Sequence, residues 1–188
     1  MLTKDYVPTR VLHDFVGRIE PLGIRYMLTG SMAMIRYTVF RQTADIDIIL
    51  ELSDSLDKAD FINALESDYY VPHNAVGRAF QGGRMFNVIH IETAFKVDCI
   101  VRKSNNFQKS AFERREKTDY YGEDVWVISK EDLILSKLWW AKDTHSEMQF
   151  KDIKNLMQAG FDIEYAKKWT EELGITDSFQ KCLNEIKE

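Results

Sequence analysis

The chain has 188 residues, of which 45% are hydrophobic and 29% charged, a composition typical of soluble folded domains and too apolar for a disordered chain. Its 25 Lys and Arg against 30 Asp and Glu give a formal net charge of −5, which argues against a surface that coats nucleic acid by charge alone. No apolar run is long enough to cross a membrane, and the N-terminus lacks the apolar region of a signal peptide. Cys99 and Cys182 stand far apart without a CxxC pattern, which supports neither a disulfide framework nor a thiolate zinc site. We therefore expect a cytoplasmic protein.

Predicted strands and helices alternate over the first two thirds of the chain. Helical elements are expected where apolar residues recur at helical spacing, and strands where β-branched residues alternate with polar ones. In chain order, these are a helix over 9–19, a strand over 25–29, a turn at Gly30-Ser31 into a helix over 32–37, a strand over 46–52, a helix over 53–67, strands over 85–92 and 95–101, a helix over 107–117 and a strand over 125–128.

From Ser129 onward the pattern is helical, with no convincing strand. Ser129 is an N-cap candidate, and Glu131 and Asp132 favour the positive end of the helix that follows. Helices are predicted over 130–142, 150–158, 163–173 and 178–186. The order of these elements therefore predicts an α/β or α+β fold, with a core over 1–128 and a C-terminal helical annex over 129–188 that packs on it.

Gly30 and Ser31 lie between a predicted strand and a predicted helix. Glycine can adopt positive φ or allow close approach of the backbone, and Ser31 presents a hydroxyl beside free N–H groups at the helix start. This arrangement suits a nucleotide phosphate, although a Gly-Ser pair alone can also be a simple turn.

Asp45 and Asp47 lie two residues apart on a predicted strand, so that both carboxylates point to the same face. Two such carboxylates repel each other unless a cation lies between them, and oxygen ligands suit Mg²⁺ or Mn²⁺. Asp98 is a single acid in a second apolar strand, where a buried carboxylate needs a partner such as a shared metal. The alternatives are a solvated strand edge for the first two acids and a salt bridge from Asp98 to Lys96 or Arg102.

The order of these features resembles the DNA polymerase beta-like nucleotidyltransferase superfamily. Gly30-Ser31 is followed, after thirteen residues, by Asp45-Ile-Asp47-Ile, and Asp98 comes later in an apolar setting. The runs Arg41-Gln-Thr-Ala-Asp-Ile-Asp47 and Glu131-Asp-Leu-Ile-Leu-Ser-Lys-Leu138 are similar to the small bacterial branch related to abortive-infection toxins of type IV toxin–antitoxin systems. The resemblance implies a mixed sheet of the nucleotidyltransferase type, flanked by helices.

The resemblance also implies roles for individual residues. Asp45 and Asp47 would hold two Mg²⁺ or Mn²⁺ ions, and Asp98 would complete the catalytic metal site and help to deprotonate the acceptor. Gly30 and Ser31 would bind the phosphates of a nucleoside triphosphate (NTP) such as ATP. Three further residues are nucleotide-binding candidates: Arg41, Thr43 and Lys137. For Lys137 the alternative is a lysine whose apolar stem is packed while its ammonium reaches solvent.

The function expected from these residues is metal-dependent transfer of a nucleoside monophosphate from an NTP to an acceptor. The acceptor class stays open among tRNA, a protein hydroxyl and a small molecule such as an antibiotic. A cognate antitoxin or toxin is a possible partner, and no membrane partner is expected. The alternative function is a non-catalytic, antitoxin-like module that binds a partner and retains a nucleotide site.

Overall fold

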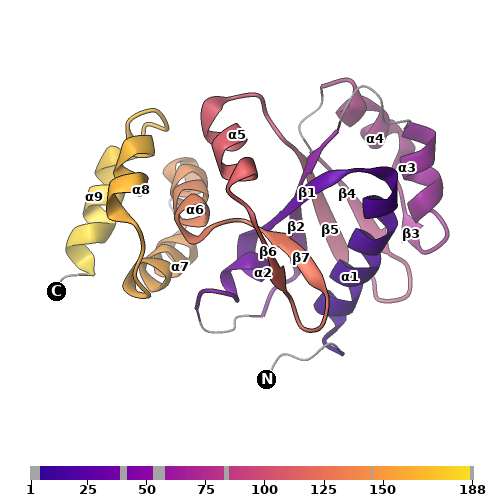
Figure 1. Cartoon of the computed structure of the whole chain (residues 1–188), viewed down its shortest axis with the longest axis horizontal. Coiled ribbons are helices and arrows are strands. Elements are labelled where there is room, and N and C mark those ends of the chain that lie inside the picture. The colour runs from indigo at the N-terminus through magenta and orange to yellow at the C-terminus, as the bar shows by residue number, and fades with distance from the viewer. Residues whose placement is uncertain (1–4, 39–41, 53–57, 83–84, 145, 187–188) are drawn as a thin grey trace.

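The computed structural model describes residues 5–38, 42–52, 58–82, 85–144 and 146–186. Over these residues it shows a seven-stranded mixed sheet with helices packed around it (Figure 1), which confirms the predicted fold class. The strands are β1 (Arg25–Thr29), β2 (Asp45–Glu51), β3 (Tyr69–Tyr70), β4 (Met85–His90), β5 (Lys96–Val101), β6 (Glu116–Asp119) and β7 (Asp124–Val127). The helices are α1 (Val7–Ile19), η1 (Glu20–Leu22), α2 (Gly30–Met34), α3 (Lys58–Leu65), α4 (His73–Phe80), α5 (Asn106–Glu113), α6 (Lys130–Thr144), α7 (Glu147–Gln158), α8 (Ile163–Thr170) and α9 (Thr176–Glu185).

The strand order is β3-β4-β5-β2-β1-β7-β6, so that β2 and β5 are neighbours in the middle of the sheet. These two strands are parallel, whereas β1 is antiparallel to β2, and β4 is antiparallel to β5. A parallel pair needs a crossover connection, and here the chain from β2 to β5 supplies it through α3, β3, α4 and β4. The sheet therefore brings together residues that are about fifty positions apart in the sequence.

The two faces of the strands β4, β5 and β2 differ sharply in chemistry. On one face, alternate residues such as Ile46, Ile48 and Val97 are completely buried. This face packs against helices: the ring of Phe61 on α3 lies edge-on to Phe86 on β4, with centroids 5.6 Å apart. The opposite face carries the acidic residues of β2 and β5, together with exposed side chains of β4 such as Met85.

The helices after β7 form the predicted helical annex, which lies beside the sheet in Figure 1. At the start of α6, the Ser129 hydroxyl donates to the Asp132 carboxylate at 2.6 Å and accepts from the Asp132 backbone N–H at 3.3 Å. This is the N-cap that the sequence predicts. The division into a core over 1–128 and an annex over 129–188 stays a prediction.

Among the described residues, four elements were not predicted, and several helix ends were placed wrongly. The sequence pattern did not predict η1, β3, α4 and β6, and it extended a helix to residue 117 although α5 ends at Glu113 and β6 begins at Glu116. It also extended a helix to residue 173, although α8 ends at Thr170. β6 has the sequence Glu-Lys-Thr-Asp, so its strand structure comes from pairing with β7 rather than from apolar alternation. The helix expected over 32–37 begins at Gly30 and gives way to a turn after Met34. Residues 53–57 of another expected helix lie outside the described residues.

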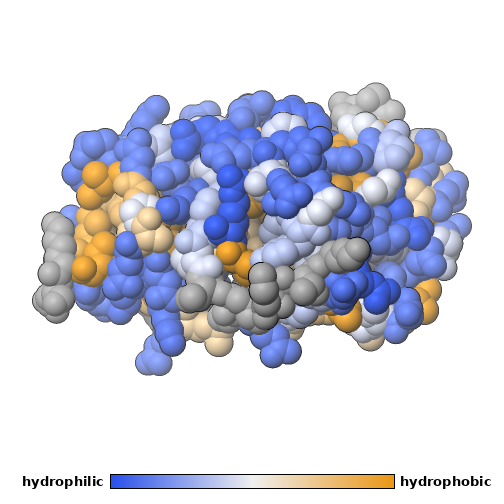
Figure 2. Space-filling model, turned by 60° about the horizontal axis from the view of Figure 1, so that its bottom comes forward, coloured by the Kyte–Doolittle hydropathy of each residue, from blue (hydrophilic) through white to orange (hydrophobic). Residues whose placement is uncertain are grey.

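The face of the molecule shown in Figure 2 is mostly polar. Figure 2 shows a largely hydrophilic face, on which apolar residues gather toward the end formed by the C-terminal helices and in smaller spots elsewhere. Among the described residues, no helix combines the length and the hydropathy needed to cross a membrane.

Candidate active site

The turn between β1 and α2 places Gly30 directly against Asp47. Gly30 has φ +64°, a conformation that side chains disfavour, and a Cβ at this position would collide with Oδ2 of Asp47. Thr29 immediately before it is the register partner of Asp47 across the antiparallel β1–β2 pair. A glycine is therefore required at position 30 because the carboxylate of Asp47 occupies the space that a side chain would take. Ser31 follows in α2 and is partly exposed.

Three acidic side chains, Asp45, Asp47 and Asp98, share the open face of the sheet; we call them the carboxylate cluster. Asp47 and Asp98 are register partners across the parallel β2–β5 pair, and Asp45 lies two residues before Asp47 on the same face. Asp98 is 8% exposed, and its Oδ1 is buried without a hydrogen-bond partner. The structure thus brings together the three acids that the sequence singled out.

Lys96 lies among these acids. It is the register partner of Asp45, and its Nζ lies 2.8 Å from Oδ2 of Asp98 and 3.5 Å from Oδ2 of Asp45. The hydrogen bond to Asp98 is the main cause of a raised pKa for Lys96. In the described part of the chain, no three His, Cys, Asp or Glu side chains are arranged to hold a metal ion directly. The contact between Lys96 and Asp98 is the salt bridge that the sequence analysis gave as an alternative. The other partner considered there, Arg102, pairs with Glu51 at 2.5 Å instead.

Asp47 is the electrostatically strained member of the cluster. Burial, followed by the negative charges of Asp45 and Asp98, raises its pKa from 3.8 to about 6. The positive charges of Lys137 and Lys96 act in the opposite direction on the same pKa. The cluster therefore carries more negative charge than the neighbouring side chains compensate, which is the condition under which a cation binds favourably.

Thr43 orders the segment before β2. Its hydroxyl donates to the backbone carbonyl of Asp45 at 3.0 Å and lies 3.4 Å from Oδ1 of the same residue. The threonine is buried, so this contact fixes the start of the acidic strand. Arg41, the other candidate in this segment, lies outside the described residues.

Lys137 on α6 is buried in an ion pair. Its Nζ lies 3.1 Å from Oδ2 of Asp152 and 3.2 Å from Oε1 of Gln149, both on α7, and its residue exposure is 5%. The ammonium therefore does not reach solvent, so the packed-stem alternative is wrong. Lys137 is nevertheless close enough to the cluster to lower the pKa of Asp47. α6 also packs against α2, the helix that begins at Gly30.

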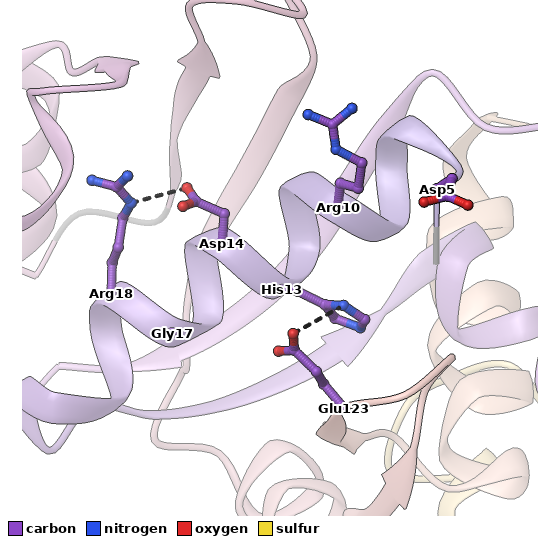
Figure 3. Close-up of a pocket in the computed structure, with 7 residues that line it drawn as sticks. All are labelled: Asp5, Arg10, His13, Asp14, Gly17, Arg18 and Glu123. Carbon is purple, nitrogen blue, oxygen red and sulfur yellow. Dashed lines mark hydrogen bonds and ion pairs between the residues drawn. The ribbon is translucent and has the colours of Figure 1, made fainter. Parts of the chain in front are cut away.

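A separate hollow lies along the outer side of α1 (Figure 3). It contains basic groups, but Arg18 is engaged by Asp14 at 2.9 Å and Asp68 at 2.6 Å, and His13 faces Glu123 at 3.6 Å. Because α1 covers the face of the sheet opposite to the acids, this hollow is distinct from the carboxylate cluster. Its lining residues are Asp5, Arg10, His13, Asp14, Gly17, Arg18 and Glu123.

Two charged residues, Lys96 and Asp152, were not among the predicted site residues although they contact residues that were. Lys96 entered only as an alternative partner for Asp98, although its position two residues before Asp98 on a strand already places it on the same face. The pairing of Asp152 with Lys137 could be found only from the packing of α7 against α6.

Several solved structures share this fold, three of which illustrate the likeness. One is ANT(2″)-Ia in complex with adenylyl-2″-tobramycin, with 14% identity and a TM-score of 0.56, covering 87% of this chain and 95% of that one. Another is an antigenic nucleotidyltransferase-like protein from Paracoccidioides brasiliensis, with 14% identity and a TM-score of 0.55, covering 97% and 94% of the two chains. The third is the lincosamide antibiotic adenylyltransferase LnuA, lincomycin-bound, with 19% identity and a TM-score of 0.50, covering 79% and 95%. At these identities the likeness establishes the fold.

The family follows from the sequence match. A comparison with curated proteins found no match. The model of the family described as "nucleotidyltransferase of unknown function" (DUF6036) matches residues 18–168, which is most of the chain. These residues include the glycine turn, the carboxylate cluster and the buried lysine of α6. The chain therefore belongs to the DUF6036 family and is a nucleotidyltransferase.

Proposed function

We propose that this protein transfers a nucleoside monophosphate from an NTP to an acceptor with the help of divalent cations held by Asp45, Asp47 and Asp98. The observation that carries the proposal is the register of β2 and β5, which places Asp47 opposite Asp98 on the open face of the sheet. Such a pair of carboxylates on strands, joined by Asp45, supplies the oxygen ligands that Mg²⁺ and Mn²⁺ prefer.

Two observations support the fit of a cation to these residues. The Oδ1 atom of Asp98 is buried and has no hydrogen-bond partner, which is costly unless a ligand supplies one. The raised pKa of Asp47 shows that the surroundings disfavour its negative charge. A bound divalent cation would neutralise the triphosphate and polarise the reacting phosphoryl group. We further propose that two divalent ions bind at these carboxylates.

The residues of the chain have separate tasks in this scheme. Gly30 lets the triphosphate approach the backbone beside Asp47, Ser31 offers its hydroxyl to the phosphates, and Lys137 adds positive charge from α6. Asp98 accepts the proton of the acceptor hydroxyl as the acceptor oxygen bonds to the α-phosphorus. The bond from the α-phosphorus to the bridging oxygen breaks at the same centre, and pyrophosphate leaves.

Thr43 acts indirectly, because its hydroxyl holds the start of the acidic strand. Arg41, two residues earlier, is proposed to reach a phosphate of the same NTP.

The donor and acceptor are proposed from chemistry and from the relatives. One structural relative is in complex with adenylyl-2″-tobramycin and another is named as a lincosamide antibiotic adenylyltransferase, which favours ATP as donor and a small hydroxylated molecule as acceptor. The net charge of −5 disfavours a large RNA as the acceptor. A protein hydroxyl, as in a toxin–antitoxin pair, is the other acceptor class consistent with the same site.

The test is label transfer from each of four α-³²P-labelled NTPs, with Mg²⁺ or Mn²⁺, to fractions of a cell extract and to hydroxylated antibiotics. We expect pyrophosphate release and labelled product with the wild type, and neither with Asp45→Asn. Asp60→Asn on α3 is the matched control, because this exposed aspartate lies away from the cluster. Protease, nuclease and filtration treatments of the labelled product identify the acceptor class. NTP binding without any transfer to these acceptors would favour a non-catalytic module that binds a partner.

A further inference from the structure

Lys96 lies within the carboxylate cluster, and the proposed reaction assigns it no task. It lies on the solvent-facing side of β5, between its register partners Asp45 on β2 and Ile89 on β4. Its ammonium bridges two strands, at 2.8 Å from Oδ2 of Asp98 and 3.5 Å from Oδ2 of Asp45. The Lys96 side chain is 37% exposed, so its stem has room to move outward.

The ammonium acts as a counter-ion for the acids. The three carboxylates of the cluster bring three negative charges to one patch of the sheet, and Lys96 is the cation that contacts two of them directly. Lys137 contributes from a greater distance, because its ammonium is bonded to Asp152 and Gln149. Removing the Lys96 charge should therefore increase the repulsion among the acids and destabilise the metal-free fold.

The same contacts conflict with the binding of a divalent cation. A cation held by Asp45 and Asp98 needs their carboxylate oxygens as ligands, and Lys96 already binds Oδ2 of both. An ammonium and a divalent ion that share these oxygens also repel each other across a partly buried site. Because the lysine stem is flexible and partly exposed, moving the ammonium outward is the simplest way to resolve the conflict.

We propose that Lys96 is an internal counter-ion that competes with the divalent cation, so that cation binding at the carboxylate cluster requires release of Lys96 from Asp98 and Asp45. The inference rests on the proposed function and deepens it. One consequence is that the free ion binds weakly, whereas the ion that arrives with an NTP binds well, since the phosphates supply further oxygen ligands. Lys96 is thus a positioning residue that couples metal loading to nucleotide binding.

The test compares the wild type with Lys96→Met, which keeps most of the unbranched side chain and removes its charge. Two quantities are measured: thermal stability in the presence of a chelator, and the affinity for Mn²⁺ without nucleotide, from the electron paramagnetic resonance signal of free Mn²⁺. We expect the variant to melt at a lower temperature and to bind Mn²⁺ roughly tenfold more tightly, the scale of one charge-assisted hydrogen bond. Adding a non-hydrolysable NTP analogue should improve Mn²⁺ binding more in the wild type than in the variant.

Lys117→Met is the matched control. Lys117 is also a strand lysine with an acidic neighbour, Asp124 at 3.7 Å, but it lies on β6 at the far edge of the sheet. The Lys117→Met substitution should leave the affinity for Mn²⁺ unchanged. Lys96→Arg should keep the weak affinity of the wild type because the charge remains, and Lys96→Gln replaces the methionine variant if that one fails to fold.

Unchanged or weaker Mn²⁺ binding in the uncharged variant would overturn the proposal, whatever its melting temperature. If the wild type transfers nucleotide while Lys96→Met binds Mn²⁺ no better, only the role of Lys96 is wrong. If neither protein binds Mn²⁺ and the wild type transfers nothing, the proposed metal-dependent function fails as well.

Discussion

Replacing Asp47 by Asn should stabilise the metal-free protein while abolishing nucleotide transfer. Burial and the charges of Asp45 and Asp98 raise the pKa of Asp47 from 3.8 to about 6, a shift of about two units. At 1.36 kcal/mol per unit, the ionised carboxylate costs the fold up to about 3 kcal/mol. Asn keeps the shape of the side chain against Gly30 and removes the charge. Because its amide still needs hydrogen-bond partners, we expect a gain of about 1–3 kcal/mol.

The gain should depend on pH in a defined direction. Above pH 6, Asp47 is ionised in the folded and unfolded states, so the wild type carries the full cost. As pH falls from 6 toward 3.8, the folded state takes up its proton first and the cost disappears. The advantage of Asp47→Asn over the wild type is therefore complete at pH 7.5 and absent near pH 4.

Chemical denaturation in the presence of a chelator measures this difference at both pH values. A gain of this size also raises the melting temperature by roughly 2–12 °C for a chain of this length. Asp60→Asn, at an exposed position on α3, is the control and should stay within about 0.5 kcal/mol of the wild type. An Asn variant that is no more stable than the wild type at pH 7.5, or equally stabilised at both pH values, would refute the electrostatic reasoning.

Three further predictions concern other parts of the site. Gly30→Ala should lower transfer and stability more than Gly23→Ala in parallel thermal and kinetic assays, because both glycines have positive φ but only the first Cβ meets a carboxylate. Lys137→Met should cost about 3–5 kcal/mol in denaturation experiments by leaving Asp152 buried without its ammonium partner. Adding Asp152→Leu should restore stability but not NTP affinity; recovery of both would show that the lysine is purely structural. Asp98→Asn should lose transfer yet still bind Mg-NTP in calorimetry, and an equal loss of binding would contradict its place in the catalytic step.

The sequence predicted those parts of the fold in which local pattern and tertiary environment agree. Strands β2 and β5 alternate between buried apolar residues and polar ones, so their faces could be assigned from period-two spacing. The N-cap at Ser129 could also be predicted, because a capping side chain acts within its own turn of the helix. By contrast, β6 consists of Glu-Lys-Thr-Asp and becomes a strand through its antiparallel pairing with β7.

The site was predictable in its acids and in the pair of Asp98 with Lys96, but not in the other contacts of its positively charged groups. That Asp45, Asp47 and Asp98 share a face follows from strand spacing and the resemblance to nucleotidyltransferases. The pairing of Asp45 with Lys96 depends on the register between β2 and β5, which is set by packing across the whole sheet. The partner of Lys137 lies fifteen residues away on another helix, so only the packing of α6 on α7 identifies it.

Three unusual features coincide at the same place in this molecule. Gly30 adopts a left-handed conformation that only glycine accommodates beside Asp47, Asp47 bears a charge that its surroundings disfavour, and a buried oxygen of Asp98 lacks a hydrogen-bond partner. The unfavourable charge of Asp47 and the unpartnered oxygen of Asp98 could each be removed by a single substitution at the residue itself, so stability alone does not account for them. Unfavourable electrostatic features that persist together are typical of functional sites. A cation bound by the acids, with phosphates beside the glycine turn, would relieve the last two and use the first, which is why we place the chemistry at this face rather than in the hollow along α1.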